Sequence, residues 1–389
     1  TRNGETWVWT TFSEDQVDLN WQNPDLLFEF IDILFLYISM GVRILRLDAV
    51  AFLWKRLGTS CLHLHETHEM VKLFRDIIET VAPHVIILTE TNVPHEENIS
   101  YFGKNDEAHM VYQFSLPPLL LHGLLTNNSA YLTDWAQNLV YPAKSCTYFN
   151  FSASHDGIGV RPIQGILPDN ELKKVTDAVI ERGGQISYKK NSDGTESPYE
   201  LNITYASALS VPADVEKGLH RFFCSQAVVL ALKGVPAVYF HSLMATQNYT
   251  EGVERTGRAR TINRRKWSEQ ELDNLLNDPE QPQSGFFSRL VQLMRRRANY
   301  PAFHPDGRQV IYDFGPEFFA LERISPLGNQ EVFCVFNFTG LPQTLNGKTK
   351  CEFLQSSRRF YDIVSGKMIS QTKKGIVLQP YQALWLVPR

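Results

Sequence analysis

The sequence has few of the features that mark redox, secreted and membrane proteins. Its 389 residues hold five cysteines, which are scattered and form no Cys-x-x-Cys pair. An odd number of unpaired thiols favours a reducing compartment, so we expect a cytoplasmic protein. No apolar run approaches the length of a membrane-spanning helix. The first ten residues, TRNGETWVWT, also lack the basic and apolar regions of a signal peptide.

An excess of charge of either sign is also missing. The net charge is -4, with 43% hydrophobic and 21% charged residues, which are ordinary values for a globular protein. They give no reason to expect nucleic acid or a membrane surface as a partner. Neither GxGxxG nor GxxxxGK[ST] occurs, which disfavours a nucleotide-binding sheet. The length predicts one large catalytic domain and at least one smaller domain.

Short apolar runs predict a parallel sheet. A strand over 43–48 precedes a helix whose Val71, Phe74, Ile78 and Val81 share one face, and a second strand over 85–90 follows at once. Further strands are predicted over 110–114, 147–151 and 236–240, with helices over 116–125 and around 219–232. From residue 308 the pattern changes to short alternating strands, which predict a C-terminal all-β module. The parallel strands suit a (β/α)₈ barrel or an open doubly wound sheet.

The stretch GVRILRLDAV contains a strand with one ionic face. Arg46 and Asp48 are two residues apart, so their side chains point to the same side of the strand. An internal salt bridge or a solvated edge strand would explain this pattern. The functional interpretation is a carboxylate at the C-terminal end of a barrel strand, which a guanidinium keeps ionised.

Three acidic residues, Asp48, Glu90 and Asp156, follow predicted strands. A single acid at a strand end is usually only solvated, but three in the same structural position suggest catalysis. Glycosidic chemistry needs one ionised carboxylate and one carboxylic acid. Arg46 makes Asp48 the candidate nucleophile, and Glu90, without a basic neighbour in sequence, is the candidate acid and base. Asp156 is a candidate for stabilising positive charge in the transition state.

The motifs around these acids resemble those of the α-amylase superfamily, glycoside hydrolase family 13. They are QVDLN, RLDAV, LTE and SHDGI, in this order. The runs RLDAVAFLWKRLGTSC, VYQFSLPPLLLHGLL, SHDGIG and GRARTINR resemble its sucrose phosphorylase subfamily. The runs TETNVPHEENISYFG, SPYELNITY and FHPDGRQ resemble the glucosylglycerate phosphorylase-type branch of that subfamily.

The resemblance implies a role for each matching residue. Asp48 corresponds to the nucleophile, Glu90 to the acid/base and Asp156 to the transition-state stabiliser. Residues that match positions around the bound glucosyl unit are Arg46, His155 and Arg260. Two positions depart from the sucrose phosphorylase pattern: Asn92 replaces a histidine, and Tyr199-Glu200 replaces a Tyr-Gln pair in the acceptor loop. The glutamate changes the charge offered to the acceptor, so fructose is in doubt as the natural partner.

The implied reaction is a retaining phosphorolysis of an α-glucoside, such as glucosylglycerate, sucrose or glucosylglycerol, to α-glucose 1-phosphate. It needs a sugar substrate and inorganic phosphate but no cofactor or metal, and Arg260 is the first candidate for binding phosphate. Hydrolysis or transglucosylation by the same superfamily is an alternative. Another is an inactive fragment that only binds sugar.

The resemblance also implies a domain layout. Residues 1–22 correspond to the end of an inserted domain B, and 23–160 with 216–300 correspond to barrel strands 4–8. Residues 161–215 are an excursion between strands 7 and 8 that carries the acceptor loop, and 308–389 form the C-terminal β domain. Only strands 4–8 of the (β/α)₈ barrel are then expected in this chain. Such a chain would expose a strand edge and apolar surface. We therefore expect poor solubility or self-association, for example as a homodimer.

Two further stretches have competing interpretations. CLHLHETHE over 61–69 has cysteine and histidines at short spacing, but it is not HExxH, and a solvated helix start is preferred to a metal site. Trp7 and Trp9 are interpreted as packing residues, although aromatic faces also stack on sugars.

Overall fold

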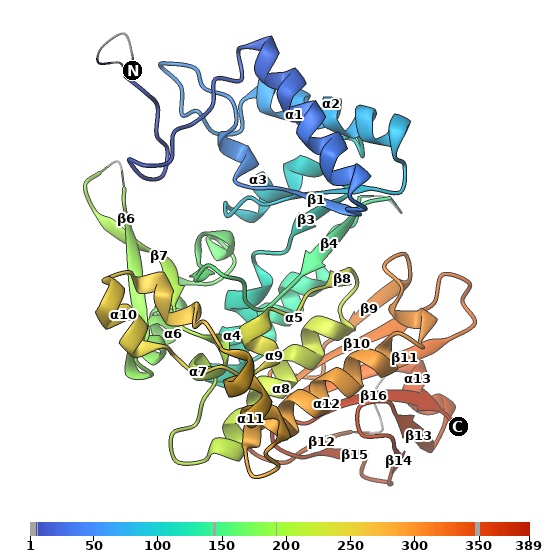
Figure 1. The fold of residues 1–389 in the computed structure, drawn as a ribbon. Helices are drawn as coiled ribbons and strands as arrows, with labels where there is room; N and C mark the ends of the chain where they lie inside the picture. Colours follow the sequence, from blue (N-terminus) through green and yellow to red (C-terminus); the bar gives the residue numbers. More distant parts are fainter. Residues whose placement is uncertain (1–4, 6, 143–144, 192, 347–350) are drawn as a thin grey trace. The chain divides into compact units, whose positions relative to one another are not determined.

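The computed structural model describes residues 5, 7–142, 145–191, 193–346 and 351–389. The chain divides into two compact units, Thr1–Tyr112 with Tyr141–Tyr148, and Gln113–Val140 with Phe149–Arg389 (Figure 1).

The first unit is built on three parallel strands. β1 pairs with β2 in the register Arg46↔Leu88, and β2 pairs with β3 in the register Leu88↔Met110. The strands are short and apolar, and Ile87 and Val111 are fully buried. The elements of this unit are α1 (Pro24–Ser39), β1 (Ile44–Leu47), η1 (Val50–Phe52), α2 (His65–Val81), β2 (Ile86–Thr89), α3 (His95–Ile99), η2 (Ser100–Phe102) and β3 (Met110–Tyr112).

The helix α2 buries one face, as its sequence predicts. Val71, Phe74 and Ile78 are at most 2% exposed. Val81, which the spacing places on the same face, is 56% exposed. It is the last residue of the helix, and the backbone leaves the helical conformation at Ala82.

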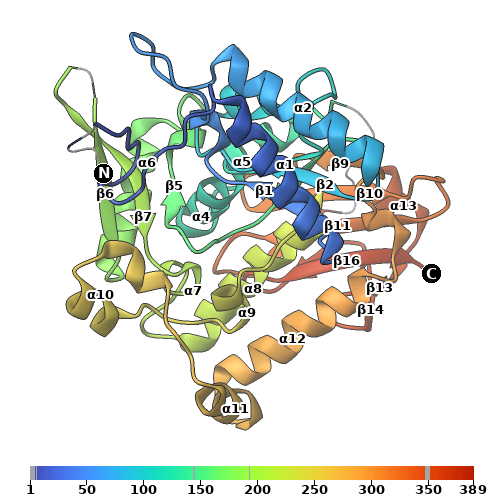
Figure 2. The same cartoon turned by 45° about the horizontal axis from the view of Figure 1, so that its top comes forward.

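The helix α1, drawn in dark blue in Figure 2, carries several exposed apolar side chains in this unit. Leu34 is the one buried side chain among its sixteen described residues. Phe28 and Leu36 are 65% and 56% exposed, and Met40, the residue after the helix, is 73% exposed. This agrees with the expectation of exposed apolar surface. Trp7 is fully exposed, so its interpretation as a packing residue is wrong.

The second unit begins its sheet with β4 and β8, which pair in parallel in the register Phe149↔Val235. The run over 236–240 is predicted as a strand, but β8 covers only two residues and Phe240 begins a short helix. A short apolar run is compatible with a strand or with a helix, and the predicted length of this strand is wrong. The elements up to residue 243 are α4 (Leu116–Thr126), α5 (Ala130–Gln137), β4 (Thr147–Asn150), β5 (Ile158–Gly159), η3 (Arg161–Ile163), α6 (Asp169–Glu181), β6 (Gln185–Lys190), β7 (Glu196–Asn202), α7 (Tyr205–Ala208), α8 (Val215–Ala231), β8 (Val235–Pro236) and α9 (Phe240–Leu243).

A three-stranded antiparallel sheet, in the order β5-β7-β6, projects from the second unit (Figure 1). β7 carries Tyr199 and Glu200, and a register shift between Ser187 and Tyr188 marks a bulge opposite them. The following elements are α10 (Thr250–Thr256), η4 (Ala259–Asn263), α11 (Glu269–Asn277), α12 (Pro282–Arg297) and η5 (Pro301–Phe303). Because η4 contacts β7, the basic segment around Arg260 lies beside Glu200.

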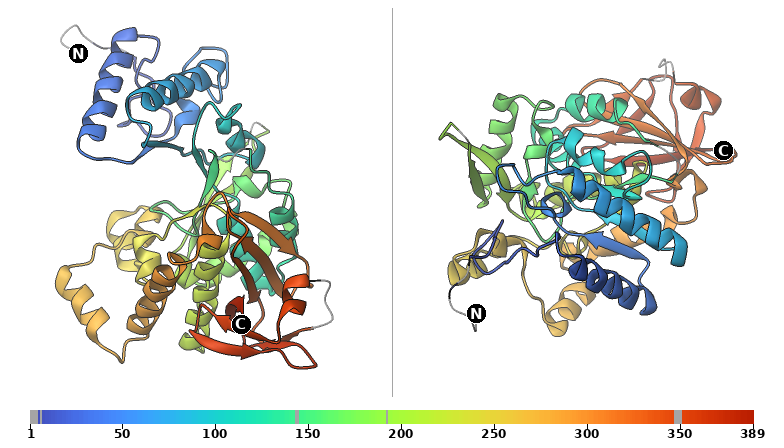
Figure 3. Two further views of the ribbon diagram at one scale, coloured as in Figure 1. Left: turned by 90° about the vertical axis from the view of Figure 1, so that its right-hand side faces the viewer. Right: turned by 90° about the horizontal axis from the view of Figure 1, so that it is seen from above.

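The C-terminal strands form a six-stranded sheet in the order β14-β13-β16-β11-β10-β9 and a two-stranded sheet, β12-β15. Figure 3 shows this part of the chain in orange and red. The helix α8 packs on α12 and contacts β11 and β16. Phe319, Phe336 and Trp385 are fully buried in the shared core. The elements are β9 (Arg308–Tyr312), β10 (Phe318–Ile324), β11 (Glu331–Asn337), β12 (Gln343–Leu345), α13 (Glu352–Ser356), β13 (Arg359–Asp362), β14 (Lys367–Ser370), β15 (Ile376–Leu378) and β16 (Ala383–Pro388).

Candidate active site

Arg46 is the centre of the polar cluster in the first unit. Its guanidinium forms an ion pair with Asp48, and its Nε donates a hydrogen bond to the Tyr112 hydroxyl at 3.0 Å. Its Nη2 lies 3.8 Å from Glu90 Oε2. Burial lowers the pKa of Arg46, but Asp48, Tyr112 and Glu90 outweigh it and raise the pKa above its usual value. The guanidinium therefore stays charged between the two carboxylates.

The two carboxylates differ in exposure. The side chain of Asp48 is 71% exposed in this unit and that of Glu90 is 13% exposed. Glu90 Oε2 also accepts a hydrogen bond from the Ala49 amide at 3.0 Å. Ala49 has a left-handed backbone with φ of 45°, which directs this amide toward Glu90. The environment of Glu90 thus differs from the expected one, because Arg46 from the adjacent strand is its basic neighbour in space.

Asn92 follows β2 by three residues and its Oδ1 is buried. Within the described ranges, this atom has no hydrogen-bond partner in the protein. The neighbouring Thr91 hydroxyl donates to Asn98 Oδ1 at 2.6 Å, and Asn98 Nδ2 donates to the Tyr112 carbonyl at 2.8 Å. These bonds hold the backbone after β2, and Asn92 Oδ1, a hydrogen-bond acceptor, lies in this held segment.

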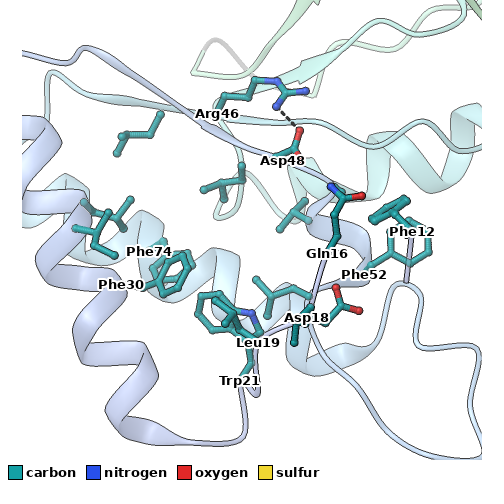
Figure 4. A pocket seen from close by; sticks show the side chains of 18 of the residues that line it. Phe12, Gln16, Asp18, Leu19, Trp21, Phe30, Arg46, Asp48, Phe52 and Phe74 are labelled. Carbon is teal, nitrogen blue, oxygen red and sulfur yellow. Dashed lines mark hydrogen bonds and ion pairs between the residues drawn. The ribbon is translucent and has the colours of Figure 1, made fainter. Parts of the chain in front are cut away.

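A cavity of about 520 Å³ adjoins Arg46 and Asp48 in the first unit (Figure 4). Aromatic side chains from the N-terminal segment, α1, η1 and α2 line it, among them Phe12, Trp21, Phe30, Phe52 and Phe74. The polar residues Gln16 and Asp18 of the QVDLN motif line it as well. Lys55 Nζ lies 3.1 Å from Asp18 Oδ2, so this carboxylate is neutralised by a structural ion pair.

Asp156 lies in the second unit, in the loop between β4 and β5, and is the acceptor for two arginines. Arg260 Nη1 donates to its Oδ1 at 2.8 Å, and Arg264 Nη2 donates to the same oxygen at 3.0 Å. His155 Nε2 lies 3.7 Å from Asp156 Oδ2, and its side chain is 57% exposed. Asn263 Nδ2 donates to the carbonyls of Ser154 and Asp156 at 2.7 and 3.1 Å, which fixes this loop.

Glu200 is held inside the second unit by the loop that carries Asp156. The residue is 3% exposed. Its Oε1 accepts from the Gly157 amide at 2.8 Å, and its Oε2 accepts from Arg260 Nε at 3.0 Å. The adjacent Tyr199 is bound through its carbonyl, which accepts from the Val160 amide at 3.1 Å. Both carboxylate oxygens of Glu200 therefore have partners within the protein.

The structure adds residues that the sequence interpretation did not select. Tyr112 ends β3 beside Arg46, and Arg264 joins Arg260 at Asp156. Arg264 lies within the quoted motif GRARTINR, so its position was available as a signal. Tyr112 had no comparable signal, because a tyrosine in a predicted strand is ordinary. Of the predicted residues, the first unit joins Arg46, Asp48 and Glu90, and the second joins His155, Asp156, Glu200 and Arg260.

Two of the three histidines of the CLHLHETHE stretch, His63 and His68, bind other side chains. His63 Nδ1 lies 3.0 Å from the Tyr101 hydroxyl and its Nε2 lies 3.0 Å from Glu97. His68 Nδ1 lies 2.8 Å from Glu107. The helix α2 begins at His65, within this stretch. Across the described ranges, no group of three or more His, Cys, Asp or Glu side chains is arranged to hold a metal.

Comparisons with known proteins identify the relatives of this chain. Residues 2–142 match the catalytic domain of the α-amylase family. The glucosylglycerate phosphorylase of Spirochaeta thermophila is 47% identical over 99% of this chain and 67% of its own length. The glucosylglycerate phosphorylase of Escherichia coli is 42% identical over 97% of this chain and 66% of its own length. The chain thus spans about two thirds of the length of the curated relatives it matches.

Among solved structures, sucrose 6F-phosphate phosphorylase from Thermoanaerobacter thermosaccharolyticum matches with a TM-score of 0.72 and 24% identity, over 85% of this chain and 64% of that one. The fold is therefore that of an α-amylase-type (β/α) barrel with a C-terminal β domain, as expected. The chain belongs to the α-amylase family, glycoside hydrolase family 13, in its sucrose phosphorylase-like branch. Among the described helices, none is both long and apolar enough to span a bilayer.

Proposed function

We propose that this protein catalyses the reversible phosphorolysis of an α-glucoside, with glucosylglycerate as the favoured donor. The products are α-glucose 1-phosphate and the free acceptor. The observation that carries this proposal is the identity of 47% and 42% to glucosylglycerate phosphorylases over nearly the whole chain. Sucrose and glucosylglycerol phosphorylases are less similar, which is why glucosylglycerate comes first.

The reaction proceeds by two displacements at the anomeric carbon. In the first, Asp48 attacks this carbon while Glu90 gives its proton to the oxygen of the departing acceptor. In the second, a phosphate oxygen attacks the glucosyl ester, Glu90 takes the proton of the phosphate, and Asp48 is released. Two inversions give net retention. Arg46 supports these roles because its ion pair with Asp48 holds that carboxylate beside Glu90.

The remaining site residues act on the substrates. Asp156 stabilises the positive charge of the transition state, and Arg260 orients Asp156 through the hydrogen bond at 2.8 Å. His155 and Arg260 contact the glucosyl unit, and Asn92, Tyr199 and Glu200 shape the acceptor site. The buried Oδ1 of Asn92, which has no hydrogen-bond partner among the described residues, supports a role for Asn92 in the acceptor site, because a hydroxyl of the acceptor molecule could donate to it.

The partners are the sugar substrate and inorganic phosphate, with no nucleic acid or membrane partner. We place the protein in the cytoplasm. The five free cysteines, all buried, support a reducing compartment. A homodimer is proposed as well, and the exposed apolar side chains of α1 support association.

Product analysis tests the proposal directly. The protein is incubated with phosphate and, separately, with glucosylglycerate, sucrose and glucosylglycerol, and glucose 1-phosphate is measured. We expect phosphate-dependent glucose 1-phosphate, most of it from glucosylglycerate, and none from D48N. Free glucose formed without phosphate would identify a hydrolase instead. No product from a folded protein that still binds the sugar would identify a sugar-binding protein.

A further inference from the structure

A segment of high positive charge borders the site in the second unit. Between Arg255 and Lys266 the chain carries six basic side chains and no acidic one. Most of its arginines have partners. Arg260 and Arg264 bind Asp156, and Arg265 Nη2 lies 3.2 Å from Glu271. Arg255 donates to the Tyr249 hydroxyl at 3.1 Å.

Arg258 differs from these arginines. It is exposed and precedes η4 as its N-cap residue, and its own amide donates to the Thr256 hydroxyl at 3.3 Å. Among the described residues, none forms an ion pair or hydrogen bond with its guanidinium. An arginine in this state has five N–H donors available for a ligand.

Arg258 lines a polar cavity of about 740 Å³. Three arginines line it, Arg258, Arg260 and Arg264, and one acidic residue, Glu200. The hydroxyl-bearing residues Ser187, Thr256 and Thr261 also line it, and the hydroxyls of Thr256 and Thr261 lie 2.8 Å from each other. The Ser187 hydroxyl accepts a hydrogen bond from Asn202 Nδ2 at 2.8 Å, so its own proton is available for another acceptor. The lining is therefore cationic and rich in donors.

We propose that this cavity binds an oxyanion through Arg258, with the Ser187 hydroxyl as a second donor. The inference rests on the proposed function and deepens it. The anion is either the carboxylate of an acidic acceptor or the attacking phosphate. Both present pairs of oxygen atoms that the two parallel N–H groups of a guanidinium can bind. Arg260 and Arg264 link the cavity to Asp156, so a bound anion lies next to a residue proposed to act in the reaction.

Calorimetric titration of the whole chain tests the proposal. The probes are inorganic phosphate, glycerate and, as an uncharged control, glycerol. The variants are R258Q, which removes the charge, and R258K, which keeps the charge without the fork. R295Q is the matched control, because Arg295 is exposed on α12 and does not line the cavity. Thermal unfolding of each variant verifies that it is folded.

We expect R258Q to weaken binding of at least one anion by about tenfold or more, with a smaller loss for R258K and no change for R295Q. A loss confined to phosphate identifies phosphate as the ligand, and a loss confined to glycerate identifies the carboxylate. The proposal is overturned if R258Q binds both anions like the unmodified chain. Equal losses in R258Q and R295Q, or no anion binding by the unmodified chain, overturn it as well.

The same proteins separate this inference from the proposed function. Anion binding that depends on Arg258, without any formation of glucose 1-phosphate, keeps the anion site and rejects the phosphorylase. The opposite outcome is an active enzyme in which R258Q leaves two values unchanged: kcat/KM for phosphate in phosphorolysis and kcat/KM for glycerate in the reverse reaction. This outcome rejects the anion site and keeps the phosphorylase.

Discussion

Arg260 joins the buried carboxylate of Glu200 to Asp156. Its Nε donates to Glu200 Oε2 at 3.0 Å, and its Nη1 donates to Asp156 Oδ1 at 2.8 Å. Burial lowers the pKa of Arg260, but Glu200 and Asp156 outweigh this effect and raise it, so the bridge is permanently charged. We therefore propose that Glu200 shapes the acceptor site indirectly, by holding Arg260 against Asp156, because both of its carboxylate oxygens have partners within the protein. In this arrangement Glu200 is a positioning residue.

Removing the charge of Glu200 tests this role. We expect E200Q to lower the free energy of unfolding by about 1–3 kcal/mol, because a hydrogen bond to a charged group is lost and a buried donor is left without its acceptor. We also expect kcat to fall more than KM rises, since Asp156 is misplaced while the substrate contacts remain. Urea unfolding and steady-state kinetics measure the two effects.

The control is E196Q, an exposed position on the same strand β7, for which we expect a change within about 0.5 kcal/mol. If Glu200 only binds the acceptor, E200Q should instead raise KM for the acceptor and leave the free energy of unfolding unchanged. That result would contradict the positioning role.

The close approach of Glu200 to Gly157 leads to a second prediction. A Cβ on Gly157 would lie 2.5 Å from Glu200 Cγ and 2.8 Å from the Leu201 carbonyl oxygen. We expect G157A to lower the free energy of unfolding by about 1–3 kcal/mol or more, because backbone and a buried side chain must both shift. In G285A, the matched control, the added Cβ has no atom within 4 Å and lies within helix α12, so we expect a gain of about 0.5–1 kcal/mol. Equal stability of the two variants contradicts the tight packing of Gly157.

The sequence predicted the elements of the site better than the contacts between them. The apolar strands and the acids that follow them were found because strand periodicity and sequence motifs are local signals. The bonds of Glu200 to Gly157 and Arg260 span 43 and 60 residues, and the pair of Arg46 with Glu90 spans two strands. No local pattern encodes such pairs. Glu200 was therefore expected to offer its charge to an acceptor, although its carboxylate is turned inward.

The fork geometry of Arg46 leads to a third prediction. Its separate nitrogens bind Asp48 and Tyr112 and approach Glu90, which the single ammonium group of a lysine cannot reproduce. We expect R46K to lower kcat/KM for phosphorolysis by about 100-fold or more, the loss typical for a misplaced catalytic group. The control is R43K, at an exposed position just before β1, which we expect to be close to unchanged. The rate of glucose 1-phosphate formation is measured for both variants. Near-normal activity of R46K would contradict the proposal that Arg46 positions Asp48 and Glu90 together.

A histidine beside the parallel strands leads to the last prediction. His109 Nδ1 accepts a hydrogen bond from the Ile87 amide at 3.0 Å, which requires an unprotonated nitrogen. Burial, with a contribution from Arg75, lowers the pKa of His109 from 6.5 to about 4, against a smaller opposing effect of Glu79. Because the folded protein binds this proton less readily than the unfolded chain, the stability from His109 is complete above pH 6.5 and is lost as the pH falls toward 4.

At pH 5 this loss amounts to about 2 kcal/mol relative to pH 7. H109N isolates it, because the amide oxygen of asparagine can accept the same bond from Ile87 but does not titrate. We therefore expect urea unfolding to show a smaller loss of stability between pH 7 and pH 5 in H109N than in the unmodified chain. Some pH dependence remains in H109N, since burial also lowers the pKa values of His95, His122, His220 and His241. An identical pH dependence of the two proteins would mean that His109 is protonated in the folded state or reaches solvent, and either case contradicts its hydrogen bond to Ile87.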